Sequence, residues 1–144
     1  MPRFYYGFKL FGALGDLKRI TFAIAAHGSA VILGRGASFL LPPEKRIAFL
    51  FVSPLEVRIR NVMEDRGLSE KHARERIVKV EAEHHQFAKK YFQADILNSA
   101  HYHLVINTDR VPYGDAARLI ADGARRCFNE NESSQGGEQN LKCS

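Results

Sequence analysis

Residues 30–36 read Ala-Val-Ile-Leu-Gly-Arg-Gly, and this stretch decides the fold of the chain. Its first four residues form a continuous apolar run, which is typical of a strand buried in a parallel sheet. Two glycines then end the run and flank Arg35 at the carboxyl end of the strand. Because parallel sheets bind ligands at the carboxyl ends of their strands, this turn is the first candidate for a functional site.

Further helices and strands alternate on both sides of this stretch. Upstream, we expect a largely apolar helix that begins near Asp16 as its N-cap and ends at Gly28. Downstream, apolar runs at 47–52 and 102–106 predict two more buried strands. This alternation predicts an α/β fold, with a parallel sheet and flanking helices.

The helices after the second strand have clear start and stop signals. Ser53-Pro-Leu-Glu56 fits a capping box, and the helix that follows should end before Gly67. Ser69 should cap a long, heavily charged helix over 70–92, which we expect to be mostly solvated or to cover a cleft. A last helix is predicted over about 114–128.

The chain divides into one domain, residues 1–128, and a tail, residues 129–144. A length of 144 residues suits a single domain. The tail is rich in Asn, Glu, Ser, Gln and Gly, which cannot bury a core, so we expect it to be disordered. The aromatic segment 4–8 is compatible with either a short strand or an irregular arm.

Composition narrows the class of protein. Hydrophobic residues make up 45% and charged residues 26%, a balance typical of a globular chain. No apolar run approaches the roughly 20 residues of a membrane span, and we see no export signal. Cys127 and Cys143 fit no zinc spacing and favour a reducing compartment over a disulfide framework. We therefore expect a cytoplasmic location and no membrane partner.

The positive charge admits two interpretations. A formal net charge of +5 and a pI of about 9.4 favour anionic ligands, but they equally suit a merely soluble surface. Arg35 could fork two hydrogen bonds to a phosphate, or it could be a solvated residue of a tight turn. The long helix carries basic residues that could neutralise phosphates or simply pair with neighbouring glutamates. These residues are Lys71, Arg74, Arg76, Lys79, Lys89 and Lys90.

A metal site is not predicted. Glu81 and His84 lie one helical turn apart, and His101 and His103 would share one face of a strand. A metal site between helices would need a second Glu-x-x-His on another helix, and the sequence contains none.

Taken in order, these segments resemble the cytidylate kinase-like family. Residues 28–37 resemble its strand and Gly-Arg-Gly-Ala turn, and residues 53–59 resemble its next strand exit and helix. Residues 67–69 and the long charged helix resemble its lid, and residues 102–108 resemble its last strand. The resemblance covers about residues 20–122. It implies a P-loop kinase fold that moves a phosphoryl group from ATP, with Mg²⁺, to a nucleoside monophosphate such as CMP.

The resemblance also implies site residues. Gly34, Arg35 and Gly36 would hold the monophosphate. Arg58 would lie near ATP, and Lys89 and Lys90 would stand where the lid carries basic residues. No residue is assigned a catalytic role.

Two departures from the family pattern stand out. The sequence has no Gly-x4-Gly-Lys-Ser/Thr loop, and no first strand precedes residue 20, so we expect phosphoryl transfer to be impaired. That strand would lie between those at 30–33 and 47–52, leaving a gap of about 9–10 Å. Either residues 4–8 fill this gap or the chain is a fragment. In the lid, Glu81-Ala-Glu-His84 replaces Asp-x-x-Arg, which weakens a charge clamp.

The alternative is a non-enzymatic domain that binds a nucleotide or another partner through a basic face. A nucleic-acid partner is not expected, because the chain lacks the aromatic platforms and basic runs of RNA-binding modules. The sequence makes no prediction of oligomeric state.

Overall fold

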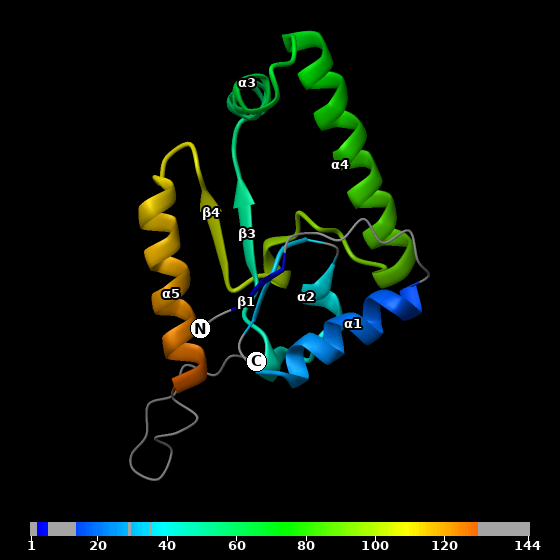
Figure 1. The fold of residues 1–144 in the computed structure, drawn as a ribbon, viewed down its shortest axis with the longest axis vertical. Coiled ribbons are helices and arrows are strands. Elements are labelled where there is room, and N and C mark those ends of the chain that lie inside the picture. Colours follow the sequence, from blue (N-terminus) through cyan, green and yellow to red (C-terminus); the bar gives the residue numbers. More distant parts are fainter. Residues whose placement is uncertain (1–2, 6–13, 29, 35, 130–144) are drawn as a thin grey trace.

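The structure is a computed structural model that describes residues 3–5, 14–28, 30–34 and 36–129. These ranges contain five α-helices and four strands, so the predicted α/β class is confirmed (Figure 1). None of the described helices combines the length and the apolar character that a membrane span requires.

The strands form two small parallel sheets. β1 (Arg3–Tyr5) pairs with β2 (Ala30–Ile32), and β3 (Phe49–Val52) pairs with β4 (Leu104–Asn107). Parallel pairing is confirmed, but a single continuous sheet is not, because no described strand joins β2 to β3. The aromatic segment does supply a strand beside β2, although residues 6–8 of it lie outside the described residues.

The first helix, α1 (Leu14–Ala26), begins two residues before its predicted cap. Gly15 therefore lies inside the helix, where it is exposed and has no neighbour near its Cα. A glycine in an exposed first turn costs only about 1 kcal/mol of helix propensity, so it does not prevent the turn from forming. Gly28 has a positive φ of 108° after the helix, as predicted for a terminal glycine.

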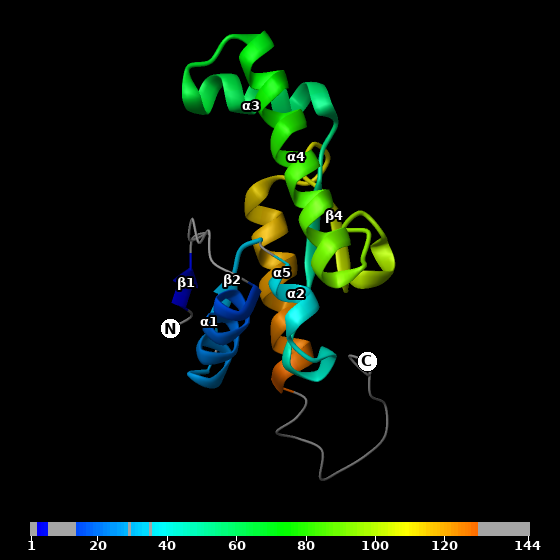
Figure 2. The ribbon, with the colours of Figure 1, turned by 90° about the vertical axis from the view of Figure 1, so that its right-hand side faces the viewer.

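Two helices form a hairpin at one end of the molecule. α3 (Leu55–Arg66) turns at Gly67, whose φ is 62°, into α4 (Glu70–Phe92). Figure 2 shows this hairpin rising above the rest of the chain. Its apolar seam is built on Ile59, Ala73 and Ile77, which are all buried. The predicted end of α3 before Gly67, the predicted bounds of α4 and the Ser69 cap, which accepts from the amide of His72, are confirmed.

The capping box predicted at Ser53 is wrong. The N-cap of α3 is Pro54, one residue later, and its carbonyl accepts from the amide of Arg58 at 3.1 Å. The hydroxyl of Ser53 is buried without a hydrogen-bond partner, while its carbonyl accepts from Nε of Arg58 at 3.0 Å. The Ser53 hydroxyl therefore does not accept from an amide of the helix, and the contact between Arg58 and the Ser53 carbonyl is a different one, in which the arginine donates.

The last helix, α5 (Tyr113–Asn129), lies along the β3–β4 sheet (Figure 1). A methyl group built at Gly123 would lie 3.5 Å from Ile47 and 3.6 Å from Phe49, so the helix packs closely here. Ile106 and Ala116 are buried on this side. Near the end of α5, Cys127 is disulfide-bonded, which departs from the expectation of reduced cysteines.

Three short elements complete the described chain. α2 (Ala37–Leu40) follows the glycine turn, and a 3₁₀ turn at Pro43–Lys45 leads to β3. A second 3₁₀ turn at Ser99–His101 lies between α4 and β4. The tail from residue 130 lies outside the described residues, so its predicted disorder stays a prediction.

Candidate functional site

The Gly34–Gly36 turn leaves β2 in a conformation that only glycine adopts freely. Gly34 and Gly36 have φ values of 69° and 67°, both in the left-handed region. The amide of Ala37 donates to the carbonyl of Gly34 at 3.4 Å, and the amide of Phe39 donates to that of Gly36 at 2.9 Å. Arg35 itself lies outside the described residues. The structure therefore describes the frame of the predicted phosphate-binding turn.

A group of rings, which we call the aromatic cluster, lies beside this turn and contacts it through Phe92 at Gly36. It consists of Phe39, Phe87, Tyr91, Phe92 and His101. Phe39 and Phe92 stack with centroids 5.4 Å apart, and His101 meets Phe39 edge-on at 5.3 Å. Phe87 meets Phe92 edge-on at 5.8 Å. The cluster joins α2, the end of α4 and the second 3₁₀ turn on the Gly36 side of the glycine turn.

The two predicted lid lysines lie at this same end of α4. Lys89 and Lys90 are exposed on its last turn, where positive charge is favoured by the helix dipole. The ammonium of Lys90 lies 5.2 Å from the ring centroid of Tyr91, within cation–π range. Since Phe92 contacts Gly36, the end of α4 that carries both lysines is adjacent to the turn.

Arg58 lies on α3, and its side chain contacts two other groups of the protein. Its guanidinium forms an ion pair with Glu81 of α4, and its Nε donates to the carbonyl of Ser53. Glu81 and Phe92 are eleven residues apart on one helix, which is roughly 16 Å along its axis. A single phosphate cannot span that distance. The structure therefore places Arg58 and the glycine turn at two separate points along α4.

The carboxyl ends of β3 and β4 meet beside Arg58. The amide of Thr108 donates to the carbonyl of Val52 at 2.9 Å, which continues the pairing of the strands. Ser53 follows directly, with its buried hydroxyl unpaired. An unsatisfied buried hydroxyl at this edge is a polar group that a ligand could use.

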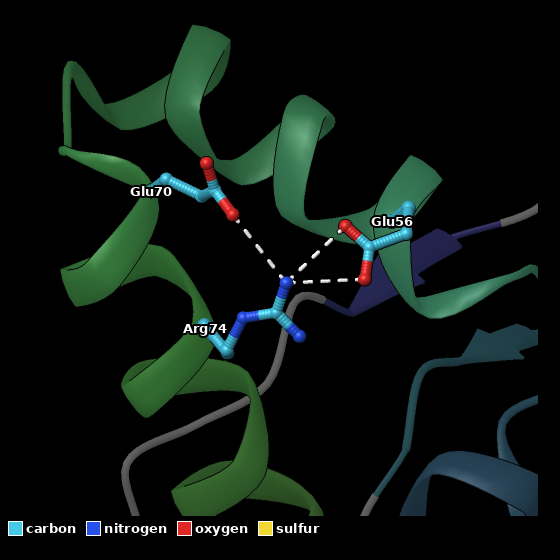
Figure 3. A network of polar contacts seen from close by, with 3 residues as sticks. All are labelled: Glu56, Glu70 and Arg74. Atoms are coloured by element: carbon cyan, nitrogen blue, oxygen red, sulfur yellow. Dashed lines mark hydrogen bonds and ion pairs between the residues drawn. The ribbon is translucent and has the colours of Figure 1, made fainter.

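Arg74, one of the basic residues of the long helix, is held by carboxylates near the start of α4. Its Nη2 lies 3.1 Å from Oε1 of Glu56 and 3.4 Å from Oε1 of Glu70 (Figure 3). The hydrogen bond to Glu56, followed by that to Glu70, raises the pKa of Arg74 above its ordinary value. For this residue the pairing interpretation is confirmed.

At the other end of the β3–β4 sheet, His103 extends the ladder with its side chain. The amide of Ala48 donates to Nδ1 of His103 at 3.0 Å, and the amide of His103 donates to the carbonyl of Ala48 at 2.8 Å. Desolvation, and then the charge of Arg46, lower the pKa of His103. The imidazole is therefore held in its neutral form near neutral pH, as an acceptor for Ala48.

The aromatic cluster and the Arg58–Glu81 pair are features that the sequence did not reveal. Phe39 and Phe92 are far apart in the chain and belong to different helices, so no periodicity connects them. The only local signal is Gly36, which admits the close approach of another group.

Comparison with known proteins agrees with the resemblance found in the sequence. The profile of the cytidylate kinase-like family matches residues 14–110, which is more than half of the chain. A cytidylate kinase of Aeropyrum pernix is 29% identical over 111 residues, covering 77% of this chain. The match spans 64% of that enzyme, so this chain corresponds to less than two thirds of its length.

Proposed function

The chain belongs to the cytidylate kinase-like family, and on this premise we propose that it binds a pyrimidine nucleoside monophosphate such as CMP at the Gly34–Gly36 turn. The observation that supports the proposal most is the frame of the turn. Two left-handed glycines stand at the end of a parallel strand, with an arginine between them in the sequence. This is the edge of a parallel sheet at which ligands bind.

Three groups would recognise the phosphate. The guanidinium of Arg35 is the fork that matches two phosphate oxygens. Among the described residues, none beyond the chain neighbours of Gly34 has an atom within 4 Å of the position that its Cβ would take, so a ligand could approach the backbone there. Lys89 and Lys90 would add positive potential from the adjacent end of α4.

The α3–α4 hairpin is proposed as the lid. It is a self-contained pair of helices that meets the rest of the chain through the start of α3 and the end of α4. Arg58 would lie on the ATP side of this lid, where its pairing with Glu81 holds the two helices together.

The sequence lacks the usual cradle for the triphosphate of ATP, because it offers no glycine-rich loop ending in Lys-Ser or Lys-Thr. Mg²⁺ would accompany ATP, held by its phosphates and at most one or two carboxylates of the protein. We therefore propose that these 144 residues bind the monophosphate but transfer phosphoryl groups poorly or not at all. A role with free nucleotides favours a cytoplasmic location.

Calorimetric titration of the chain with CMP tests the proposal. We expect saturable binding that Arg35→Ala abolishes. The matched control is Arg118→Ala, which removes an equal charge from an exposed position on α5. Binding that is unaffected by Arg35→Ala would contradict the proposed site. Salt-dependent binding of RNA without base preference, and no binding of CMP, would instead favour the non-enzymatic domain with a basic face.

A further inference from the structure

The two glycines of the turn differ in what lies against them. Apart from its chain neighbours, no described residue has an atom within 4 Å of a methyl group built at Gly34. A methyl group built at Gly36 would overlap Cε2 of Phe92 and lie 3.1 Å from its Cζ and 3.2 Å from its Cδ2. The ring of Phe92 thus occupies the space beside the Cα of Gly36. The ring packs against the turn at Gly36 and does not contact Gly34.

The ring that makes this contact is itself fixed in place. Phe39 stacks on it with an interplanar angle of 23°, and Phe87 packs edge-on at 68°. Phe39 is also tied to the turn, because its amide donates to the carbonyl of Gly36 at 2.9 Å. The ring is therefore packed against groups from both the turn and α4.

The end of α4 is also well defined. Its C-cap is Gln93, a residue with a positive φ of 52°, and the amide of Gln93 donates to the carbonyl of Ala88. Ala88 is only 2% exposed. The hydrogen bond from Gln93 to the buried Ala88 fixes the last turn of α4. Phe92, which lies in this turn, is therefore held beside Gly36.

We propose that Phe92 is a positioning residue, which holds the Gly34–Gly36 turn in the conformation that binds the monophosphate and couples this turn to the lid helix α4. The inference rests on the proposed function. A turn that is already fixed loses less conformational entropy when the ligand binds, and this preorganisation strengthens binding without any contact between Phe92 and the ligand. Because Arg58 meets the same helix at Glu81, a movement of the lid would be transmitted to the turn.

The test compares Phe92→Leu with Tyr91→Leu, which removes a ring from the adjacent position of the same cluster but not the one against Gly36. We expect Phe92→Leu to weaken CMP binding about tenfold or more, in line with the cost of displacing a positioning group. Tyr91→Leu should leave the affinity within about twofold. Phe92→Tyr keeps the ring and should restore the affinity of the unchanged chain. If Phe92→Leu fails to fold, Phe92→Met fills a similar volume without a flat ring.

A second readout does not depend on the ligand. In the NMR spectrum, the α-protons of Gly36 should show a ring-current shift that disappears in Phe92→Leu and remains in Tyr91→Leu. A folded Phe92→Leu chain that binds CMP as tightly as the unchanged chain would overturn the inference and leave the proposed function intact. An unchanged chain that does not bind CMP, while keeping the ring-current shift, would overturn the proposed function and with it the role of Phe92 in binding.

Discussion

The two ends of α4 are held by different kinds of contact. At its start, Ala73 and Ile77 pack on Ile59 of α3, and the carboxylates of Glu56 and Glu70 hold Arg74 at the surface. At its end, Phe92 stacks on Phe39 and packs against Gly36, a residue of the glycine turn that lies more than fifty residues earlier in the chain.

The contacts at the start of α4 stabilise a local hairpin, whereas the contacts at its end position the candidate site. The start of α4 is a local hairpin, and its stability comes from the apolar seam more than from exposed ion pairs, which contribute little. The end of α4 makes the long-range contact that brings this helix and the glycine turn together. We therefore expect changes at the start to affect stability alone, and changes at the end to affect both stability and binding.

The largest effect is expected at Gly36. Gly36→Ala forces a residue with a side chain into the left-handed region, at about 1–2 kcal/mol, and overlaps Phe92, at about 1–3 kcal/mol more. Gly34→Ala is the matched control, since it has the same backbone strain and open space around it. Urea unfolding measures both variants. Equal losses of stability would mean that the ring of Phe92 does not brace the turn.

A smaller effect is expected in the hairpin seam. Ile77→Ala removes a side chain that is 8% exposed, and should lower the free energy of unfolding by about 2 kcal/mol. Val78→Ala, one position along and 55% exposed, should cost less than about 0.5 kcal/mol. CMP affinity of the folded chain should be the same in both. A loss of affinity in Ile77→Ala would break the distinction between the two ends of the helix.

The smallest effect is a pH dependence at the base of the β3–β4 sheet. The lowered pKa of His103 means that the unfolded chain binds the proton more readily, so stability is present above the ordinary value of about 6.5 and is lost as the pH falls through the lowered pKa. His103→Asn keeps an acceptor for the amide of Ala48 but does not titrate. The midpoint of unfolding should therefore fall less with acid in this variant. An identical acid slope in both chains would contradict the assignment.

The sequence predicted what is local and periodic. The end of α3, the bounds of α4, the turn at Gly67 and the Ser69 cap follow from caps and apolar spacing within one segment. Two predictions failed for different reasons. The helix after Ser53 begins one residue later than its capping box implies, so the hydroxyl of Ser53 is not its cap. The strands divide into two sheets because pairing depends on which segments meet in space, and a single sequence does not show this.

The sequence likewise predicted the local parts of the candidate site and missed the contacts between them. The glycine turn and the lysines were placed correctly on their elements, because both lie beside clear start and stop signals. That these elements touch through Phe92 could not be predicted, because stacking between Phe39 and Phe92 leaves no pattern in a single sequence.

The central claim is that the turn after β2 binds a nucleoside monophosphate. We would titrate the ¹⁵N-labelled chain with CMP and follow its backbone amides. The account predicts saturable shifts that are centred on Gly34, Gly36 and Ala37, and that vanish in Arg35→Ala. Shifts that are absent, or that spread over the exposed lysines of the chain without saturating, would contradict it.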